Sequence, residues 1–118
     1  MAAHHELGKK GEALAITWLH QRGYELLYKN WRHAHVEVDI IAIKENVLHF
    51  IEVKSRSSNA FGYPEESVSE KKMQNLMLAA EEFLFRFPHW KRIQFDVLSI
   101  NISKAGNIDF FLIEDLYL

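Results

Sequence analysis

The sequence predicts an α/β domain in which one mixed β-sheet is flanked by helices, with the element order αβββαβ. Apolar residues repeat with helical spacing near the N-terminus and again in the second half of the chain. Between these stretches lie three short segments rich in β-branched and aromatic residues, and further segments of this kind follow the second helix. With 118 residues the chain has room for one hydrophobic core, so residues 1–118 are expected to form one domain.

The first helix is predicted from about His5 to Arg22, and Gly23 marks its end. Glu12 lies near one edge of its apolar stripe rather than opposite it. The stripe consists of residues spaced three, four and seven apart, namely Leu7, Leu14, Trp18 and Leu19. This helix therefore has one face for a core and a carboxylate beside that face.

The second helix is predicted from about Val68 to Phe87. Ser67 and Glu70 have the spacing of a capping box, and Pro88 closes the helix. Its apolar stripe consists of Leu76, Ala80, Phe83 and Leu84. Met73, Leu76, Met77 and Ala80 could support a dimer, but packing in the core of one chain is the default expectation.

Five segments are predicted to be strands, and turn-forming residues separate them. The strands are Tyr24–Trp31, Val36–Ile43, Val47–Val53, Ile93–Asn101 and Ile108–Ile113. The third is apolar almost throughout, as expected of a strand that is covered on both faces. Lys44-Glu45-Asn46 suits a hairpin, Ser55–Pro64 is predicted to be a loop, and Ala105-Gly106-Asn107 is predicted to be a turn.

The composition excludes several classes of function. The chain has no cysteine, which rules out disulfides, thiolate metal sites and cysteine nucleophiles, and it suits a reducing, cytoplasmic location. It has neither the basic-then-apolar start of a signal peptide nor an apolar run near the ~20 residues that span a bilayer. The net charge of −2 argues against tight, non-specific binding of nucleic acid, but it is compatible with a local basic rim around an acidic site.

Two pairs of charged residues on neighbouring strands point to a metal site. Because side chains alternate along a strand, Glu52 and Lys54 share one face, as do Glu37 and Asp39. If the hairpin pairs the two strands, Asp39 and Glu52 lie opposite each other, with their Cβ atoms about 5 Å apart. Two carboxylates at that separation repel unless a cation lies between them, and such oxygen ligands suit Mg²⁺ or Mn²⁺.

This arrangement predicts a phosphodiesterase site. A cation held by Asp39 and Glu52 could polarise a phosphoryl oxygen and activate a bound water. Lys54 could orient that water or stabilise the developing negative charge, and Glu12 could complete the site. The alternative from the residues alone is an ordinary ion pair between Glu52 and Lys54 at a strand end, with Asp39 a carboxylate near a turn.

Several motifs, in order along nearly the whole chain, resemble the YraN-like family of uncharacterised bacterial proteins. They are G-K-K-G-E-A-L-A (Gly8 to Ala15), R-G-Y (Arg22 to Tyr24), K-N-W-R (Lys29 to Arg32), E-V-D-I-I-A (Glu37 to Ala42), F-I-E-V-K-S-R (Phe50 to Arg56), F-G-Y-P-E-E-S-V (Phe61 to Val68) and F-D-V (Phe95 to Val97). Asp39 followed by Glu52-Val53-Lys54 is similar to the D…(D/E)-x-K core of restriction-endonuclease-like nucleases. The helix-first order resembles that of the Holliday-junction resolvases in this superfamily.

This resemblance implies a restriction-endonuclease-like fold and a Mg²⁺-dependent endonuclease that acts on DNA, including branched or junction DNA. It implies that Asp39 and Glu52 are metal ligands, Lys54 the catalytic lysine and Glu12 an accessory acid. Glu37, Arg56 and Gln74 match family positions without a defined role. His35-Val36 departs from the glycine that family members often have before the acidic strand motif. The alternative function is a non-catalytic module that binds nucleic acid or protein on a nuclease scaffold.

Other interpretations concern residues around this core. His35, Glu37 and Asp39 alternate onto one strand face and could bind a softer metal such as Mn²⁺ or Zn²⁺, although a solvated histidine is the usual outcome. Lys71 and Lys72 could contact DNA or form a solvated helix turn. The cluster Trp31-Arg32-His33 could stack on a splayed base, although a tryptophan that anchors the core is the commoner arrangement. A homodimer is expected on branched DNA, because twofold proteins match twofold substrates.

Overall fold

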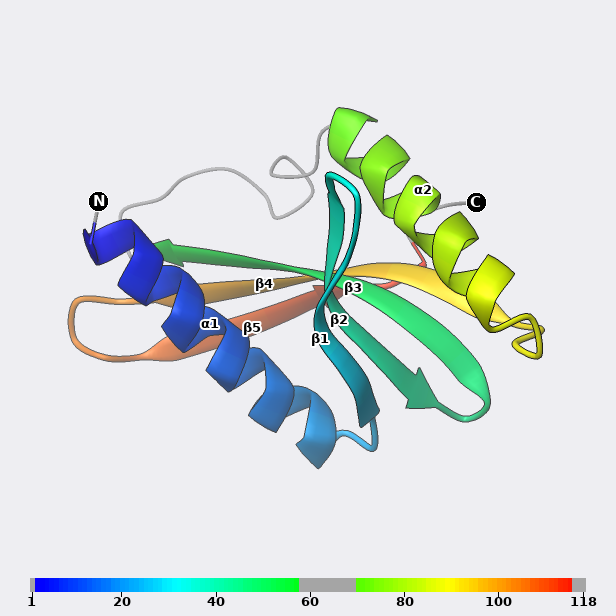
Figure 1. Ribbon diagram of the computed structural model, residues 1–118. Coiled ribbons are helices and arrows are strands. Elements are labelled where there is room, and N and C mark those ends of the chain that lie inside the picture. The colour runs from blue at the N-terminus through cyan, green and yellow to red at the C-terminus, as the bar shows by residue number, and fades with distance from the viewer. Residues whose placement is uncertain (1, 58–69, 116–118) are drawn as a thin grey trace.

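The computed structural model describes the backbone of residues 2–57 and 70–115, with side chains from residue 8 onward. Its elements are α1 (Ala2–Gln21), β1 (Glu25–His33), β2 (Val36–Lys44), β3 (Val47–Ser57), α2 (Glu70–Arg86), β4 (Ile93–Ile102) and β5 (Ile108–Ile113). The strands form a five-stranded sheet in the order β1-β2-β3-β4-β5 (Figure 1). Only the pairing of β3 with β4 is parallel, and α2 lies in the crossover between these two strands. The predicted restriction-endonuclease-like αβββαβ core, with a mixed sheet and flanking helices, is confirmed.

The main correction concerns the end of β3. Ser55, Arg56 and Ser57 were predicted to begin a loop, but they continue the strand. They do so because β4 runs parallel beside them, up to the pair Ser57↔Ile102, and provides partners for their backbone groups. The remainder of the predicted loop, residues 58–64, and the predicted capping residue Ser67 lie outside the described residues.

Two hydrophobic cores fill the space between the sheet and the helices, one on each face. The core under α2 contains Leu48 and Phe50 of β3, and the core under α1 contains Ile51 of the same strand. The sheet is therefore covered on both faces, which explains the almost continuously apolar sequence of β3. On α2, Leu76 and Ala80 are buried in the core under this helix, and Met73 and Met77 pack against that core. This agrees with the expectation that these residues pack within one chain. Neither described helix has an apolar stretch that could cross a lipid bilayer.

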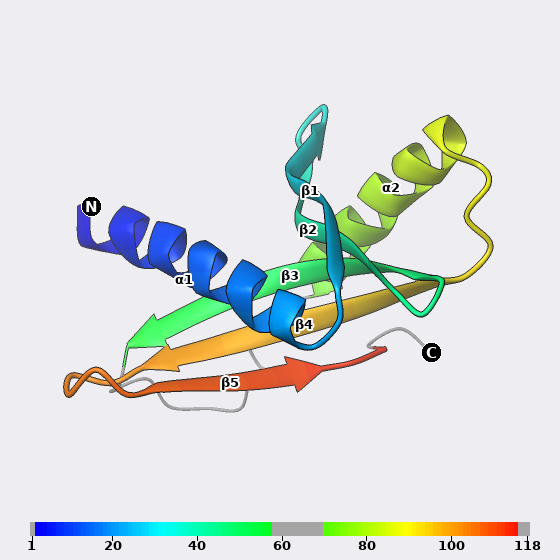
Figure 2. The same ribbon diagram turned by 90° about the horizontal axis from the view of Figure 1, so that it is seen from below.

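The β1–β2 hairpin bends away from the rest of the sheet at Asp39. Paired residues of β2 and β3 extend from Lys44↔Val47 to Ile40↔Ile51 and go no further. Val38 belongs to the core under α2, whereas Ile40 belongs to the core under α1, so the strand changes its buried face around Asp39. Figure 2 shows the hairpin rising between the two helices. The result is a fork between β2 and β3, with Asp39 at its base.

A residue with unusual backbone conformation lies across from this bend. Asn30 of β1 falls between the pairs Lys29↔Ile40 and Trp31↔Val38, and so it lies opposite Asp39. Its φ is 53°, in the left-handed region that asparagine tolerates better than most residues. Both strands of the hairpin are therefore irregular at the same level.

Candidate functional site

The fork between β2 and β3 brings three of the predicted site residues into one pocket. Asp39 of β2 and Glu52 and Lys54 of β3 line a polar cavity of about 290 Å³. The backbone N–H of Val53 donates a hydrogen bond to Asp39 Oδ2 at 2.8 Å. This bond replaces the strand pairing that ends one residue earlier and holds the Asp39 carboxylate at the base of the fork.

Helix α1 supplies the fourth predicted residue, Glu12, which lines the same cavity. The helix can approach β3 this closely because residue 11 is glycine. A Cβ at Gly11 would overlap the side chain of Ser55, the residue after Lys54. The glycine thus allows close packing of α1 against β3, which sets Glu12 beside the strand that carries Glu52 and Lys54.

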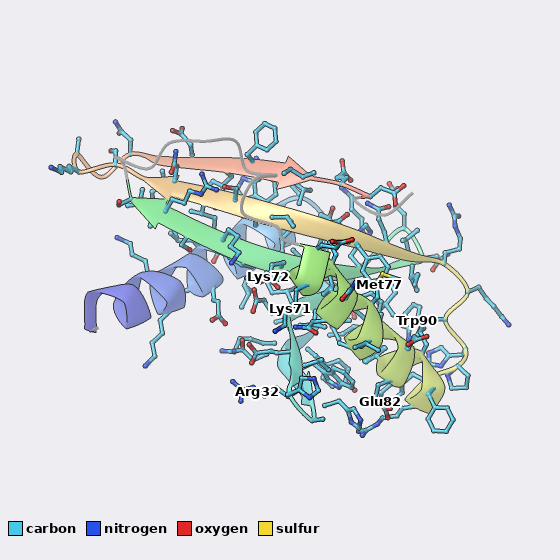
Figure 3. All side chains as sticks on the ribbon, turned by 90° about the horizontal axis from the view of Figure 1, so that it is seen from above. Arg32, Lys71, Lys72, Met77, Glu82 and Trp90 are labelled. Carbon is cyan, nitrogen blue, oxygen red and sulfur yellow. The ribbon has the colours of Figure 1, made fainter. Side chains whose placement is uncertain are left out.

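Helix α2 reaches the pocket from the other face of the sheet through Lys72. Its Nζ lies 2.8 Å from Oε1 of Glu52, whose side chain is 13% exposed. Figure 3 shows Lys71 and Lys72 together in the first turn of α2, above the middle of the sheet. Among the described residues, the ion-pair partner of Glu52 is therefore Lys72 rather than Lys54. The simple pairing of Glu52 with Lys54 along one strand, expected if the site were purely structural, is absent from this part of the chain.

The pKa values of the two lysines in the pocket are shifted in opposite directions. Burial lowers the pKa of Lys54 below its usual value, and the neighbouring Lys72 lowers it further. Burial opposes the charge of Lys72 as well, but its hydrogen bonds with Glu52 and Lys54 raise its pKa overall. Lys72 therefore carries the positive charge that balances Glu52, and Lys54 is the more weakly basic amine.

Asp39 is the most strongly perturbed acid of the pocket. Burial raises its pKa to about 7, and the charges of Glu52, Glu12 and Glu37 raise it in the same direction. The hydrogen bond from Val53 N–H opposes the shift without cancelling it. The carboxylates around Asp39 carry more negative charge than the described basic residues of the pocket balance. A divalent cation relieves such an excess of negative charge.

The donor set fits a hard divalent cation. Asp39 and Glu52 offer carboxylate oxygens from adjacent strands, Glu12 offers a third from the helix, and the open cavity leaves room for water ligands. Mg²⁺ usually retains several waters and takes only one or two protein carboxylates. In the described residues, no three histidine or acidic side chains already stand close enough to hold a metal by themselves. Glu37 instead forms a 2.6 Å ion pair with Arg32, and this does not support the alternative site with His35 and Asp39.

Comparison with known proteins places this pocket in a family. Residues 11–100, which include every residue that lines the fork from α1, β2, β3 and α2 except Gly8, match the model of the uncharacterised protein family UPF0102. The chain belongs to this family. The UPF0102 protein of Bacteroides thetaiotaomicron is 41% identical over 107 residues, covering 91% of this chain and 88% of the relative. That of Flavobacterium johnsoniae is 42% identical over 120 residues, covering 98% and 94%. The predicted resemblance to the YraN-like family is thus confirmed.

The remaining predicted residues of this UPF0102 protein lie around the pocket at different distances from it. Arg56 is half-buried further along β3, opposite Asn101 of β4. Lys71 is exposed on the first turn of α2. Gln74 lines a separate, mainly apolar groove between α2 and β4. Trp31 packs edge-on against Phe83 at 5.4 Å in the core under α2, which agrees with the anchoring role that was expected to be commoner.

The sequence pointed only partly to the role of three residues at the UPF0102 pocket. Lys72 was expected either in a solvated helix turn or at a DNA contact, and its contact with Glu52 was not foreseen. Gly11 was recognised only as part of a motif, and its close contact with Ser55 was not foreseen. Asn30 was placed in a strand without comment. An asparagine inside a strand that is rich in aromatic residues and leucine is unfavourable for that strand, and this was the available signal for the bend.

Proposed function

We propose that this UPF0102 protein is a Mg²⁺- or Mn²⁺-dependent endonuclease that hydrolyses phosphodiester bonds in DNA, with branched DNA among its substrates. The supporting observation is that Asp39, Glu52 and Lys54 line one polar cavity at the fork between β2 and β3. Asp39 comes from β2 and Glu52 and Lys54 from β3, and the fork between these two strands leaves the cavity open beside all three. A cytoplasmic location would give the protein access to its DNA.

Each residue has a distinct part in this proposal. Asp39 and Glu52 would hold the cation, with Glu12 beside them. When bound, the cation supplies charge that stabilises a phosphoryl oxygen and makes a water more nucleophilic. Nζ of Lys54 donates a hydrogen bond that orients the attacking water. As the water oxygen bonds to phosphorus and releases a proton to solvent, the bond between phosphorus and the leaving oxygen breaks. The leaving oxygen takes up a proton from solvent, and Lys54 stabilises the negative charge that develops.

One contact favours a second candidate, a module that binds nucleic acid or protein without cutting it. Lys72 already pairs with Glu52 at 2.8 Å and occupies an oxygen that a cation would need. If this pair persists in the presence of Mg²⁺, the cavity is neutralised from within and has no catalytic ion. In the nuclease, by contrast, Glu52 would hold the cation and Lys72 would be available to a substrate phosphate.

The two candidates are separated by cleavage and metal-binding assays on the same set of variants. Labelled duplex, nicked, single-stranded, flapped and four-way-junction DNA are incubated with Mg²⁺ or Mn²⁺. The test variants are Asp39→Asn, Glu52→Gln and Lys54→Ala. Asp109→Asn and Lys104→Ala, which change exposed residues of β5 and the preceding turn, are the matched controls. Calorimetric titration with Mn²⁺ measures the affinity for metal directly.

A nuclease requires that the wild type and both control variants cut at least one of these DNAs. Lys54→Ala should then cut about a hundredfold more slowly while it retains metal and DNA binding. Asp39→Asn and Glu52→Gln should lose metal affinity as well, because each removes a charged ligand. A wild type that binds no Mn²⁺ and cuts no substrate on the panel would leave the binding module as the function.

A further inference from the structure

The cavity at the fork, which we call the acidic pocket, is lined by Glu12, Asp39, Glu52 and Lys54. A second, larger groove adjoins it on the side of α1. It has a volume of about 780 Å³ and lies between α1 and the β1–β2 hairpin. Its lining consists of Lys9, Glu12, Ala13 and Ile16 from the helix and of Lys29, Asn30, Arg32 and Glu37 from the hairpin. The bend of the hairpin at the level of Asn30 and Asp39 separates these two walls. The groove is therefore a product of the same irregularity that opens the acidic pocket.

The groove is continuous with the acidic pocket, because Glu12 lines both. Asn30 lines the groove and lies opposite Asp39 in the hairpin, so a second residue connects the two. A chain-like ligand in the groove would thus lead directly to the two carboxylates. The apolar groove between α2 and β4 shares no lining residue with the pocket.

Cations stand on both walls of the groove. Lys9 on the helix and Lys29 on the hairpin are exposed, and neither forms an ion pair with another described residue. Arg32 is exposed too, and it is held by Glu37 through a 2.6 Å bond to its Nε. On the helix wall, Ala13 and Ile16 add apolar surface to the lining. Cations on both walls together with apolar surface suit a polymer that has charged phosphates and apolar faces of sugars or bases.

We propose that this groove, which we call the α1–β1 groove, binds a single nucleic-acid strand that continues from the phosphodiester group in the acidic pocket. Lys9 and Lys29 contact its phosphates from opposite sides. The volume is that of a site for a drug-sized ligand, so it holds a few nucleotides of one strand rather than both strands of a duplex. The inference rests on the proposed nuclease function and specifies its substrate, namely DNA with a single-stranded arm next to the bond that is cut.

The salt dependence of binding tests this proposal without requiring any cleavage. Fluorescence anisotropy measures the affinity for a labelled single-stranded oligonucleotide at several salt concentrations, with Ca²⁺ or EDTA in place of Mg²⁺. Each phosphate contact on a single strand contributes about 0.7 to the slope of log K against log salt. The double substitution Lys9→Ala plus Lys29→Ala should therefore lower the slope by about 1.4. The control is Lys91→Ala plus Lys104→Ala, which removes two exposed lysines outside the groove and the pocket.

The cleavage assay provides an independent measurement. On DNA with a flap or overhang, the double substitution at Lys9 and Lys29 should raise KM about tenfold or more and leave kcat within about twofold. The reason is that the groove binds the arm equally tightly in the substrate complex and in the transition state. A blunt duplex, which offers no single-stranded arm to the groove, should be cut poorly by the wild type. Flaps of both polarities are used, so that either direction of the strand in the groove is detected.

The outcomes distinguish this inference from the proposed function on which it rests. In one outcome, the slope of log K against log salt falls in the Lys9→Ala plus Lys29→Ala variant, while the wild type cuts no substrate. This outcome supports the strand-binding groove and overturns the nuclease. Cleavage that depends on Asp39, with an unchanged slope in the groove variant, supports the nuclease and overturns the groove. A wild type that binds no single strand at low salt overturns the groove as well. Thermal melting of each variant confirms that the lysine substitutions leave the fold intact.

Discussion

The sheet contains two aspartates with contrasting surroundings, one of them fully buried and the other half-buried. Asp96 of β4 is fully buried, and its carboxylate is saturated with partners: His49 Nδ1 lies 2.7 Å from Oδ2, while Gln94 Nε2 and the backbone N–H of Asp115 donate to Oδ1 at 2.8 and 2.9 Å. Asp39 of β2 has one hydrogen bond, from Val53 N–H, among the described residues. Its charge interacts with those of the carboxylates of Glu52, Glu12 and Glu37, and with those of Lys54 and Lys72.

The contrast indicates what each aspartate is for. A buried carboxylate that serves the fold is surrounded by hydrogen-bond donors, because each lone pair without a partner costs free energy. Asp96 meets this requirement and joins β3, β4 and the C-terminal segment. Asp39 is held in place by one bond, and its remaining capacity points into a cavity. Such under-satisfied acids are a property of sites that await a cation or a substrate.

Substitution of Asp96 should have the largest effect. Asp96→Ala leaves His49, Gln94 and the N–H of Asp115 without their acceptor in a buried position, so the free energy of unfolding should fall by about 4 kcal/mol. Urea denaturation measures it, with the exposed Asp109→Asn as the matched control. A loss below about 1 kcal/mol would show that the donors around Asp96 contribute little and would remove the contrast with Asp39.

Asp39→Asn should act in the opposite direction. Because burial and the neighbouring acids raise the pKa of Asp39 to about 7 in the fold, folding favours its protonated form. Its contribution to stability is fully present below pH 4 and is lost as the pH rises toward 7. Without metal, the asparagine variant should thus be equal in stability to the wild type at pH 4 and more stable than it by about 2 kcal/mol at pH 8. This is about half of what the full pKa shift implies, because water screens the half-buried carboxylate. Melting in EDTA at the two pH values measures this difference.

Addition of Mn²⁺ at pH 8 should then invert that order. The wild type is expected to gain stability from the cation, whereas the asparagine variant, with one charged ligand fewer, should gain little. If metal-free Asp39→Asn is less stable than the wild type at pH 8, Asp39 is a structural acid of the same kind as Asp96.

Gly11→Ala should have an intermediate effect that is confined to the pocket end of the sheet. The new Cβ meets the side chain of Ser55, so α1 or β3 must shift, at a cost of about 2 kcal/mol. Glu12 should move with the helix and reduce Mn²⁺ affinity. In a Ser55→Gly background the same substitution should cost much less, and this double-mutant cycle isolates the contact. Equal costs in both backgrounds would place the strain elsewhere.

Asn30 should give the smallest effect. Its φ of 53° is costly for residues with a Cβ, so Asn30→Ala should destabilise the protein by about 1 kcal/mol, whereas Asn30→Gly should be neutral. Chemical denaturation of the two variants measures the difference. Equal stabilities would indicate that β1 can straighten opposite Asp39, and the bend of the hairpin would then have another cause.

The parts of the site that follow from local periodicity could be predicted, and the parts that follow from packing could not. The alternation of strand side chains placed Glu52 beside Lys54, and the hairpin placed Asp39 across from Glu52. The contact of Lys72 with Glu52 depends on how α2 docks against the sheet, which no local pattern encodes. The extension of β3 to Ser57 likewise depends on a distant partner, β4.

The parallel pairing of β3 with β4 has a consequence for the order of folding. The first three strands pair through local hairpins, but β4 reaches β3 only after the chain has passed through α2, and such non-local pairing is slow because it closes a long loop. Beyond Ile51, where the described pairs with β2 end, Glu52 and Lys54 have their recorded backbone neighbours on β4 alone, at Val97 and Ser99. A growing chain that still lacks β4 therefore carries every side chain of the acidic pocket and has no means of holding Glu52 and Lys54 in register.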